Sequence, residues 1–359
     1  MSEKILITGI GGFLGHHCLK YFLDHTDYNI IGLDSFVHKG TCQRIETVTG
    51  PNPRVKIFKH DLTVPIDRQL ENLLLDRKID SAGNIVEDRI DAIINIASDS
   101  AVERSISNPS LCWKNNCDLM LTILEFARIA KPKIFIQVSS DEVYGEAQPL
   151  PSKGHEEWST IMPSNPYAAS KAAQEALCIS YFRSYDVPIV ITNCMNLIGE
   201  CQDPEKFIPK IIQCVAQGHC VPIYGDADQS GNHTDSNGVR WNIGSRVYLD
   251  ALNKADALVF LTKQKVSKYS QGFKSPDRYN ICGTESLDNL EIAVLISNIM
   301  QKQLNYKLVA CESARAGYDR RYALDGSKLA SKGWVAPIPF DSTILRIVNS
   351  SLKNAQWII

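Results

Sequence analysis

The 359-residue chain carries almost no net charge, because its 38 lysines and arginines are matched by 40 aspartates and glutamates. No long block of like charges occurs, so neither nucleic acid nor an acidic membrane surface is expected as a partner. No apolar run approaches the roughly 18 residues that a membrane-spanning helix needs. The chain leads from Met1 almost directly into a predicted strand, which argues against a signal peptide.

Cysteine patterns typical of metal sites and disulfide frameworks are also missing. The eleven cysteines are an odd number, none forms a Cys-x-x-Cys pair, and the eight histidines show no ligand spacing with them. Cys178 and Cys214 lie in apolar runs, where a cysteine behaves as a small buried hydrophobe. We therefore expect no metal site and a reducing, cytoplasmic setting. Internal repeats and low-complexity segments are absent as well.

Short β-branched runs alternate with helix-length segments through the first half of the chain. The predicted strands are residues 4–8, 29–34, 55–60, 91–97, 133–139 and 188–193, and the clearest predicted helices are residues 15–23, 115–130 and 166–185. This alternation is typical of βαβ units and of a parallel sheet covered on both faces. The sequence therefore predicts an α/β fold of the doubly wound Rossmann type.

The second half of the chain follows a different pattern. We expect helices at 205–217, 246–261 and 287–304, strands at 221–225 and 279–282, and a surface loop or hairpin at 226–244. Residues 1–195, with later returns near 246–283, should form the sheet domain. Residues 196–245 and 284–359 should form most of a smaller, discontinuous α/β domain.

A glycine-rich loop follows the first predicted strand. Gly9, Gly12 and Gly15 have the spacing that allows a tight turn, a close approach of backbone to a pyrophosphate, and close packing of helix on strand. The helix that follows offers free N–H groups to an anion. Asp34 ends the next strand, where a carboxylate accepts hydrogen bonds from a ribose diol and repels a 2′-phosphate. With no arginine nearby, the pattern favours NAD over NADP.

Other residues near this loop are weaker cofactor candidates. Asp61 follows the third strand, where it would contact adenine or serve as an ordinary turn carboxylate. Ala97 and Asn116 are also cofactor candidates, but any buried small residue or helix-capping asparagine would give the same pattern. The remaining cofactor candidates are Phe13, Leu14 and Leu62.

Groups able to carry out acid–base chemistry gather at two further places. Ser140, Asp141 and Glu142 follow the strand expected at 133–139, and Tyr167 and Lys171 lie four residues apart on one helix face. Ligands of open α/β sheets bind at the carboxyl ends of the strands, so both sets should meet in one cleft. A phenol beside a lysine serves as a base, and two adjacent carboxyl groups supply a separate acid and base.

With these motifs the chain resembles the extended short-chain dehydrogenase/reductases, and among them the nucleotide-sugar 4,6-dehydratases of the dTDP-glucose type. Besides the glycine loop and the tyrosine–lysine pair, the matching segments are residues 138–145, 192–196, 204–209, 222–225, 279–281 and 317–323. They extend over nearly the whole length. The Asp141–Glu142 pair discriminates most, because related epimerases and decarboxylases do not carry both carboxyl groups after the serine or threonine.

The resemblance implies a role for each catalytic candidate. Tyr167, assisted by Ser140 and Lys171, takes the proton of the sugar 4-hydroxyl while hydride passes from the 4-carbon to NAD. Glu142 then removes the proton at the 5-position, and protonated Asp141 gives its proton to the departing 6-hydroxyl. NADH returns the hydride to the 6-carbon. Adjacent carboxyl groups repel each other's charge, so one of the two keeps its proton near neutral pH.

The resemblance also implies a substrate-binding set. Donors to the substrate diphosphate are expected at Asn196, Lys206 and Arg246, with Asn280 and Arg315 behind them; Pro222 and Tyr224 would line the base pocket near Tyr322, and Ser100 and Phe207 complete the set. Exposed salt bridges and packed aromatic side chains would explain several of these residues equally well. The expected partners are a nucleotide-diphospho-hexose and a second copy of the chain, paired through the helix after Tyr167 and the helix at 115–130.

Departures from the family pattern leave the nucleotide open. Asp99 stands where the family usually has a histidine, and residues 230–245 form an insertion next to Arg246. The substrate could carry dTDP, UDP, CDP or GDP, with dTDP-glucose and UDP-glucose favoured. Two other functions stay open, a nucleotide-sugar epimerase or decarboxylase of the same fold and a non-catalytic NAD-binding protein.

Overall fold

The computed structural model describes residues 3–81, 84–148, 152–229, 231–270, 272–311, 317 and 319–357. Its contacts divide the chain into two compact units. The first consists of Met1–Ser140, Pro166–Asn193 and Ala255–Tyr279, and the second of Asp141–Asn165, Cys194–Lys254 and Asn280–Ile359. Residues 141–165 and 246–254 thus belong to the second unit, whereas the boundaries expected from the sequence place them with the sheet domain.

A seven-stranded sheet in the order β14-β8-β7-β6-β1-β2-β3 supports the first unit. Its strands are β1 (Lys4–Thr8), β2 (Asn29–Asp34), β3 (Val55–Lys59), β6 (Ala92–Asn95), β7 (Ile134–Val138), β8 (Ile189–Cys194) and β14 (Asp277–Ile281). Strands β3, β2, β1, β6, β7 and β8 pair in parallel. The order reverses between β1 and β6, as in a Rossmann sheet, so the predicted doubly wound fold is confirmed.

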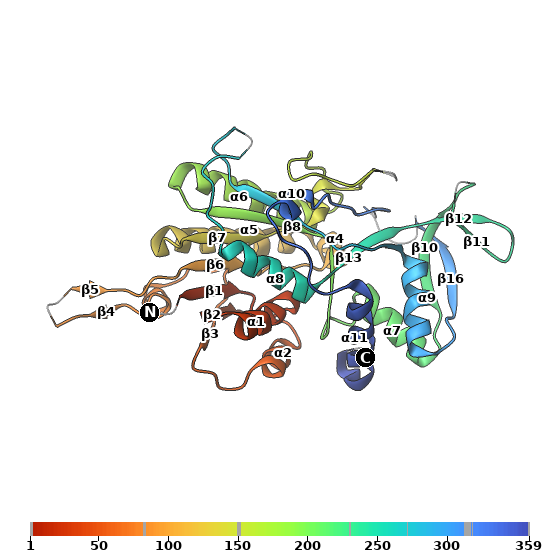
Figure 1. Ribbon diagram of the computed structural model, residues 1–359, viewed down its shortest axis with the longest axis horizontal. Helices are drawn as coiled ribbons and strands as arrows, with labels where there is room; N and C mark the ends of the chain where they lie inside the picture. Colours follow the sequence, from red (N-terminus) through yellow and green to blue (C-terminus); the bar gives the residue numbers. More distant parts are fainter. Residues whose placement is uncertain are drawn as a thin grey trace. The chain divides into compact units, whose positions relative to one another are not determined.

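Helices cover both faces of this sheet (Figure 1). They are α1 (Phe13–His25), α2 (Thr41–Val48), α3 (Arg68–Leu74), α4 (Val102–Ser107), α5 (Pro109–Ala130), α6 (Pro166–Tyr185) and α8 (Ala251–Thr262), and a small ladder joins β4 (Lys78–Ile79) to β5 (Ile85–Val86). Met120 of α5 and Phe182 of α6 pack with Leu6 and Phe135 of the sheet in one buried cluster. Burial of such apolar side chains is the main stabilising contribution to the unit.

The second unit contains two smaller sheets, in the orders β11-β12-β10-β16 and β15-β13-β9. Its elements are η1 (Asp141–Tyr144), β9 (Asn196–Ile198), α7 (Phe207–Gln217), β10 (Val221–Ala227), β11 (His233–Thr234), β12 (Arg240–Ile243), β13 (Ser245–Asp250), β15 (Ser286–Asp288), α9 (Asn289–Met300), β16 (Tyr306–Ala310), α10 (Ser327–Ser331), α11 (Phe340–Lys353) and η3 (Ala355–Trp357). Ile212, Ile296 and Ile347 bring α7, α9 and α11 together in its core.

One segment of the second half differs from the sequence-based expectation, and a neighbouring segment agrees with one of its two alternatives. The helix expected at 246–261 begins only at Ala251, because Ser245–Asp250 forms a strand that pairs in parallel with β9 and antiparallel with β15. Residues 231–244, in the segment expected as a loop or hairpin, contain the antiparallel ladder β11–β12, and β12 pairs in turn with the end of β10, whereas residue 230 of that segment lies outside the described residues. The hairpin alternative was therefore right, whereas the helical assignment of 246–250 was wrong.

A buried ion pair joins α6 to the edge of the large sheet. Arg278 Nη2 of β14 lies 2.7 Å from Glu175 Oε2 of α6, and both side chains are almost completely buried. Asn193 at the end of β8 donates a hydrogen bond from Nδ2 to the other oxygen, Glu175 Oε1, at 2.7 Å. Glu175 thus holds helix α6 against two strands at once.

We expect Glu175→Ala to lower the free energy of unfolding by about 3–5 kcal/mol, because it leaves a buried guanidinium without its carboxylate. Equilibrium unfolding in urea measures this. The matched control is Asp24→Ala, which breaks the exposed pair with Lys20 and should cost less than about 1 kcal/mol. Equal costs for the two variants would contradict the account.

Candidate active site

The glycine loop forms a tight cradle between β1 and α1. Gly9 adopts a left-handed conformation with φ of +64°, which favours glycine. A Cβ at Gly15 would lie only 2.0 Å from the Gly9 carbonyl oxygen, so no larger residue fits there. Gly12 caps α1, and Phe13 and Leu14 open it, which leaves the N–H groups of the first turn available to an anion.

Asp34 lies beside this cradle at the end of β2. Its Oδ2 accepts a hydrogen bond from the Gly11 N–H at 2.9 Å, and its Oδ1 accepts one from the Phe36 N–H at 2.9 Å. Each carboxylate oxygen keeps further acceptor capacity, which a ribose diol would use. At the end of the next strand, Asp61 Oδ1 accepts from the Thr63 N–H and hydroxyl, both at 2.9 Å, and the adjacent Leu62 is buried.

The adjacent ends of β1 and β6 are joined by the hydroxyl of Thr8. It donates to Asn95 Oδ1 at 2.6 Å and accepts from the Ala97 N–H at 3.1 Å. A Cβ on Gly9 would lie 3.0 Å from the Ala97 Cα, so the predicted cofactor residue Ala97 borders the glycine cradle. Sequence reasoning overlooked Thr8, which ends the predicted strand 4–8, and Asn95, which lies within the predicted strand 91–97 and ends β6.

From Asn95 a chain of buried side-chain amides crosses the sheet. Asn95 Nδ2 donates to Gln137 Oε1 at 2.8 Å, Gln137 Nε2 to Gln174 Oε1 at 3.0 Å, and Gln174 Nε2 to the Asn116 carbonyl at 2.7 Å. Asn116 then donates from Nδ2 to Ser170 Oγ at 2.8 Å. All of these side chains are fully buried, so the cofactor candidate Asn116 orients α6 from inside the protein.

The tyrosine–lysine pair lies on α6 at the carboxyl end of the sheet. Ser170 Oγ donates to the Tyr167 carbonyl at 2.7 Å, which ties Tyr167 to the amide chain. Lys171 Nζ donates to the Val138 carbonyl at 3.1 Å, at the last residue of β7 and two residues before Ser140. Tyr167, Lys171 and Ser140 are all nearly buried. The structure therefore gathers these three catalytic candidates around the ends of β7 and α6.

The two carboxyl candidates open the second unit. Asp141 and Glu142 form the first turn of η1, directly after Ser140, and Asp141 is 3% exposed. Glu142 Oε2 accepts from Asn165 Nδ2 at 2.8 Å and lies 3.5 Å from the Tyr322 hydroxyl. Sequence reasoning missed Asn165. The predicted position of Tyr322 near the nucleotide base stays a prediction, and in this structure the Tyr322 hydroxyl faces a carboxyl candidate.

Arg246 packs on the ring of Tyr322. Its guanidinium carbon lies 4.4 Å from the ring centroid, and its nitrogens donate to the carbonyls of Asp319 and Arg320 at 2.8 Å. Burial and the charge of Glu142 raise the pKa of the Tyr322 phenol above its ordinary value, so the ring keeps its proton. Arg246 therefore fixes the 319–322 segment in this structure in addition to its expected role toward a diphosphate.

Other substrate candidates lie around the sheets of the second unit. Pro222 and Tyr224 alternate with the buried Val221 and Ile223 along β10, so their side chains share the face opposite the core. Cys311 follows β16 close to Asp226, whose charge, after burial, raises the pKa of the thiol to about 11. Because side chains alternate along β10, the side chain of Asp226 lies on the same face of the strand as those of Pro222 and Tyr224.

The remaining candidates have mixed placements. Lys206 caps α7 and pairs with Glu205 at 3.5 Å, whereas Asn280 is buried and donates from Nδ2 to the carbonyls of His155 and Asp325. Asn280 thus serves as a structural clamp here. Asn196 begins β9 half-buried, Phe207 packs against the second core, Ser100 is exposed after β6, and Arg315 lies outside the described residues.

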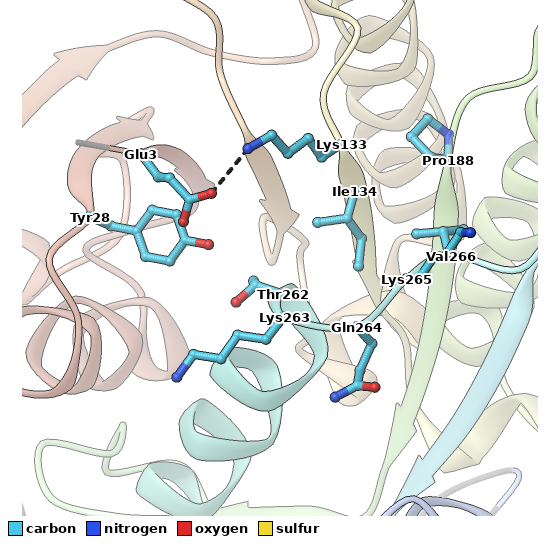
Figure 2. Close-up of a pocket in the computed structure, with 10 residues that line it drawn as sticks. All are labelled: Glu3, Tyr28, Lys133, Ile134, Pro188, Thr262, Lys263, Gln264, Lys265 and Val266. Carbon is cyan, nitrogen blue, oxygen red and sulfur yellow. Dashed lines mark hydrogen bonds and ion pairs between the residues drawn. The ribbon is translucent and has the colours of Figure 1, made fainter. Parts of the chain in front are cut away.

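The hollow drawn in Figure 2 is lined by residues of the first unit and by none of the predicted site residues. It has a volume of about 610 Å³ and is lined by residues such as Glu3, Tyr28, Lys133 and Pro188, which precede or begin strands of the large sheet. It therefore opens at the amino ends of the strands, opposite the edge that carries the glycine loop. Among the described residues no group of histidine, cysteine and acidic side chains is arranged to hold a metal ion, and none of the described helices could cross a membrane.

We expect Asp34→Asn to weaken NAD binding about tenfold or more, because it removes the charge from a carboxylate that would accept hydrogen bonds from the ribose. Calorimetric titration of the purified protein with NAD measures the change. Asp27→Asn, at an exposed carboxylate between α1 and β2, is the control and should leave binding unchanged. Unaltered affinity in Asp34→Asn would exclude the ribose contact.

Comparison with known proteins agrees with this geometry. The model of the NAD dependent epimerase/dehydratase family matches residues 5–239. The low-salt glycan biosynthesis protein Agl12 of Haloferax volcanii is 31% identical over 98% of this chain and 99% of its own length. A trifunctional UDP-glucose 4,6-dehydratase, 3,5-epimerase and reductase of Arabidopsis thaliana is 29% identical over 99% of this chain and 48% of its own length.

A solved structure of a known enzyme has a fold similar to that of this chain. The dTDP-glucose 4,6-dehydratase DesIV of Streptomyces venezuelae, solved with NAD bound, is 27% identical, covers 99% of this chain and 98% of its own, and superposes with a TM-score of 0.80. The glycine cradle beside Asp34 fits the same dinucleotide. The chain belongs to the NAD dependent epimerase/dehydratase family, as an extended short-chain dehydrogenase/reductase with NAD as its cofactor.

Proposed function

We propose that this protein is a hydro-lyase that converts a nucleotide-diphospho-glucose into its 4-keto-6-deoxy sugar. The observation that carries the proposal is the Asp141–Glu142 turn, which follows Ser140 directly and in which Asn165 holds Glu142 at 2.8 Å. An epimerase or decarboxylase of this fold would use Tyr167 and Lys171 but would have no need of this acid and base. A non-catalytic NAD-binding protein would have no need of either set.

In the proposed reaction each residue moves or holds a proton. Tyr167, with Lys171 and Ser140 beside it, takes the proton of the 4-hydroxyl. NAD held by the glycine cradle and Asp34 would supply the hydride-accepting and hydride-donating chemistry. The 4-ketone acidifies the 5-position, so Glu142 removes that proton, and Asp141 protonates the departing 6-hydroxyl, which leaves as water. General acid–base groups of this kind each contribute about 10²–10⁴-fold to a rate.

The nucleotide is proposed to be dTDP or UDP, since a similar solved enzyme acts on dTDP-glucose and a similar plant enzyme on UDP-glucose. The outer face of β10, with Pro222 and Tyr224, is the proposed base-binding surface. The hairpin insertion extends this surface, because Asn242 of β12 pairs with Asp226 of β10 and so presents its side chain on the same face.

Mass spectrometry of reactions with dTDP-glucose and with UDP-glucose tests this proposal. We expect one of the two substrates to lose a single water with no net formation of NADH. The reaction should need no added NAD beyond what the purified protein retains. Substrate of unchanged mass in both reactions, together with a changed sugar configuration by NMR, would establish the epimerase instead.

We expect Glu142→Gln to block elimination by about 10²-fold or more, because the amide cannot take up the proton at the 5-position. The first oxidation needs only Tyr167, Ser140 and Lys171, so the absorbance of reduced cofactor should build up on the enzyme. Glu156→Gln, on an exposed carboxylate between η1 and α6, is the control and should turn over normally. Normal turnover by Glu142→Gln would refute the assignment of the base.

We also propose that the protein is a homodimer formed through α5 and α6. Helix α5 exposes large apolar side chains, among them Trp113 at 50% and Leu121 at 42%, which a partner helix would cover. Light scattering at micromolar protein should give twice the mass of the 40.0 kDa chain. Trp113→Glu should shift the mass toward the monomer, whereas a monomeric wild-type protein would refute the proposal.

A further inference from the structure

The hydroxyl of Tyr322 lies between two carboxyl groups of the second unit. Its oxygen is 2.8 Å from Asp319 Oδ2 and 3.5 Å from Glu142 Oε2. A phenol has a single proton to donate, and the shorter contact has the geometry of a full hydrogen bond. The proton therefore points to Asp319, and the phenol oxygen presents a lone pair to Glu142.

Asp319 is built into the protein as a hydrogen-bond acceptor. It is 5% exposed, and its second oxygen, Oδ1, accepts a hydrogen bond from Ser164 Oγ at 2.6 Å. A Cβ at Gly317, which has a φ of +65°, would lie 2.1 Å from the Ser164 carbonyl oxygen, so glycine is required for this close approach. Ser164 immediately precedes Asn165, the residue that donates to Glu142. Asn165 and Tyr322, which both contact Glu142, are therefore connected to each other through Ser164 and Asp319.

We infer that Asp319 is a positioning residue, which keeps the Tyr322 proton turned away from Glu142 so that the phenol oxygen can accept a hydrogen bond from Glu142 once that carboxyl group is protonated. The inference rests on the proposed dehydratase function. When Glu142 takes the proton from the sugar 5-carbon, the C–H bonding pair stays with the sugar and expels the 6-hydroxyl, which takes a proton from Asp141 and leaves as water. The new carboxyl O–H then has an acceptor in Tyr322, which continues to donate to Asp319.

The charge of Asp319 matters because the alternative arrangement would weaken the base. Without a carboxylate behind it, the phenol would turn its proton to Glu142 and stabilise the ionised form of that group. A charge-assisted hydrogen bond of this kind contributes more than a neutral one. Arg246 keeps the ring in place in either case, since it lies over the Tyr322 face and binds the Asp319 carbonyl.

The test compares Asp319→Asn, Tyr322→Phe and the double variant, with Asp341→Asn, at an exposed carboxylate in the first turn of α11, as the control. Asp319→Asn keeps the shape and should slow water loss about 10- to 100-fold, with KM and the first oxidation nearly unchanged. Reduced cofactor should accumulate, and exchange of the 5-hydrogen with heavy water should slow equally. Tyr322→Phe should slow water loss to a similar extent. The double variant should lose water no more slowly than Tyr322→Phe alone, because Asp319 acts through the phenol.

Asp341→Asn removes a carboxylate charge of the same unit outside this assembly and should leave water loss as in the wild type. Multiplying effects in the double variant, or equal losses in KM, oxidation and melting temperature, would show a structural role and overturn the inference. A wild-type protein that dehydrates no nucleotide sugar would overturn the proposed function and this inference together. Wild-type dehydration with a fully active Asp319→Asn would overturn the inference alone.

Discussion

The line of buried hydrogen bonds from Thr8 to Gln174 is the interaction on which the first unit depends. It connects β1, β6 and β7 with α6 through side chains that are completely shielded from water. Buried amides are costly unless each is paired, so such a chain allows one register of strands and helix. The glycine loop at one end and Tyr167 at the other are thereby held in fixed positions on the same edge of the sheet.

In the second unit, charged side chains and close backbone contacts hold the candidate site residues in fixed positions. Arg246 binds two backbone carbonyls of the 319–320 segment and covers the Tyr322 ring, and Asp319 binds both Tyr322 and Ser164. The carboxyl group of Glu142 meets this assembly through Asn165 and the phenol. The peptide bond between Ser140 and Asp141 connects the two sets of chemical groups.

The sequence predicted the parallel strands well because their β-branched runs are local signals; β1 and β2 have the expected limits, Lys4–Thr8 and Asn29–Asp34. It failed at β13, where the pairing partners β9 and β15 come from distant parts of the chain. The same reason explains the site. Compact sequence motifs contain the candidates Asp141, Glu142, Tyr167 and Lys171. Asp319 instead accepts a hydrogen bond from Ser164, 155 residues away, and no local pattern reveals this contact.

The central claim is that one site oxidises the 4-carbon and reduces the 6-carbon of the same sugar. The most direct measurement uses a nucleotide-glucose with deuterium at the 4-carbon and locates the label in the product by NMR. The account predicts deuterium in the new 6-methyl group together with a 4-ketone. Deuterium recovered at the 4-carbon of a sugar that keeps its 6-hydroxyl would contradict it and identify an epimerase.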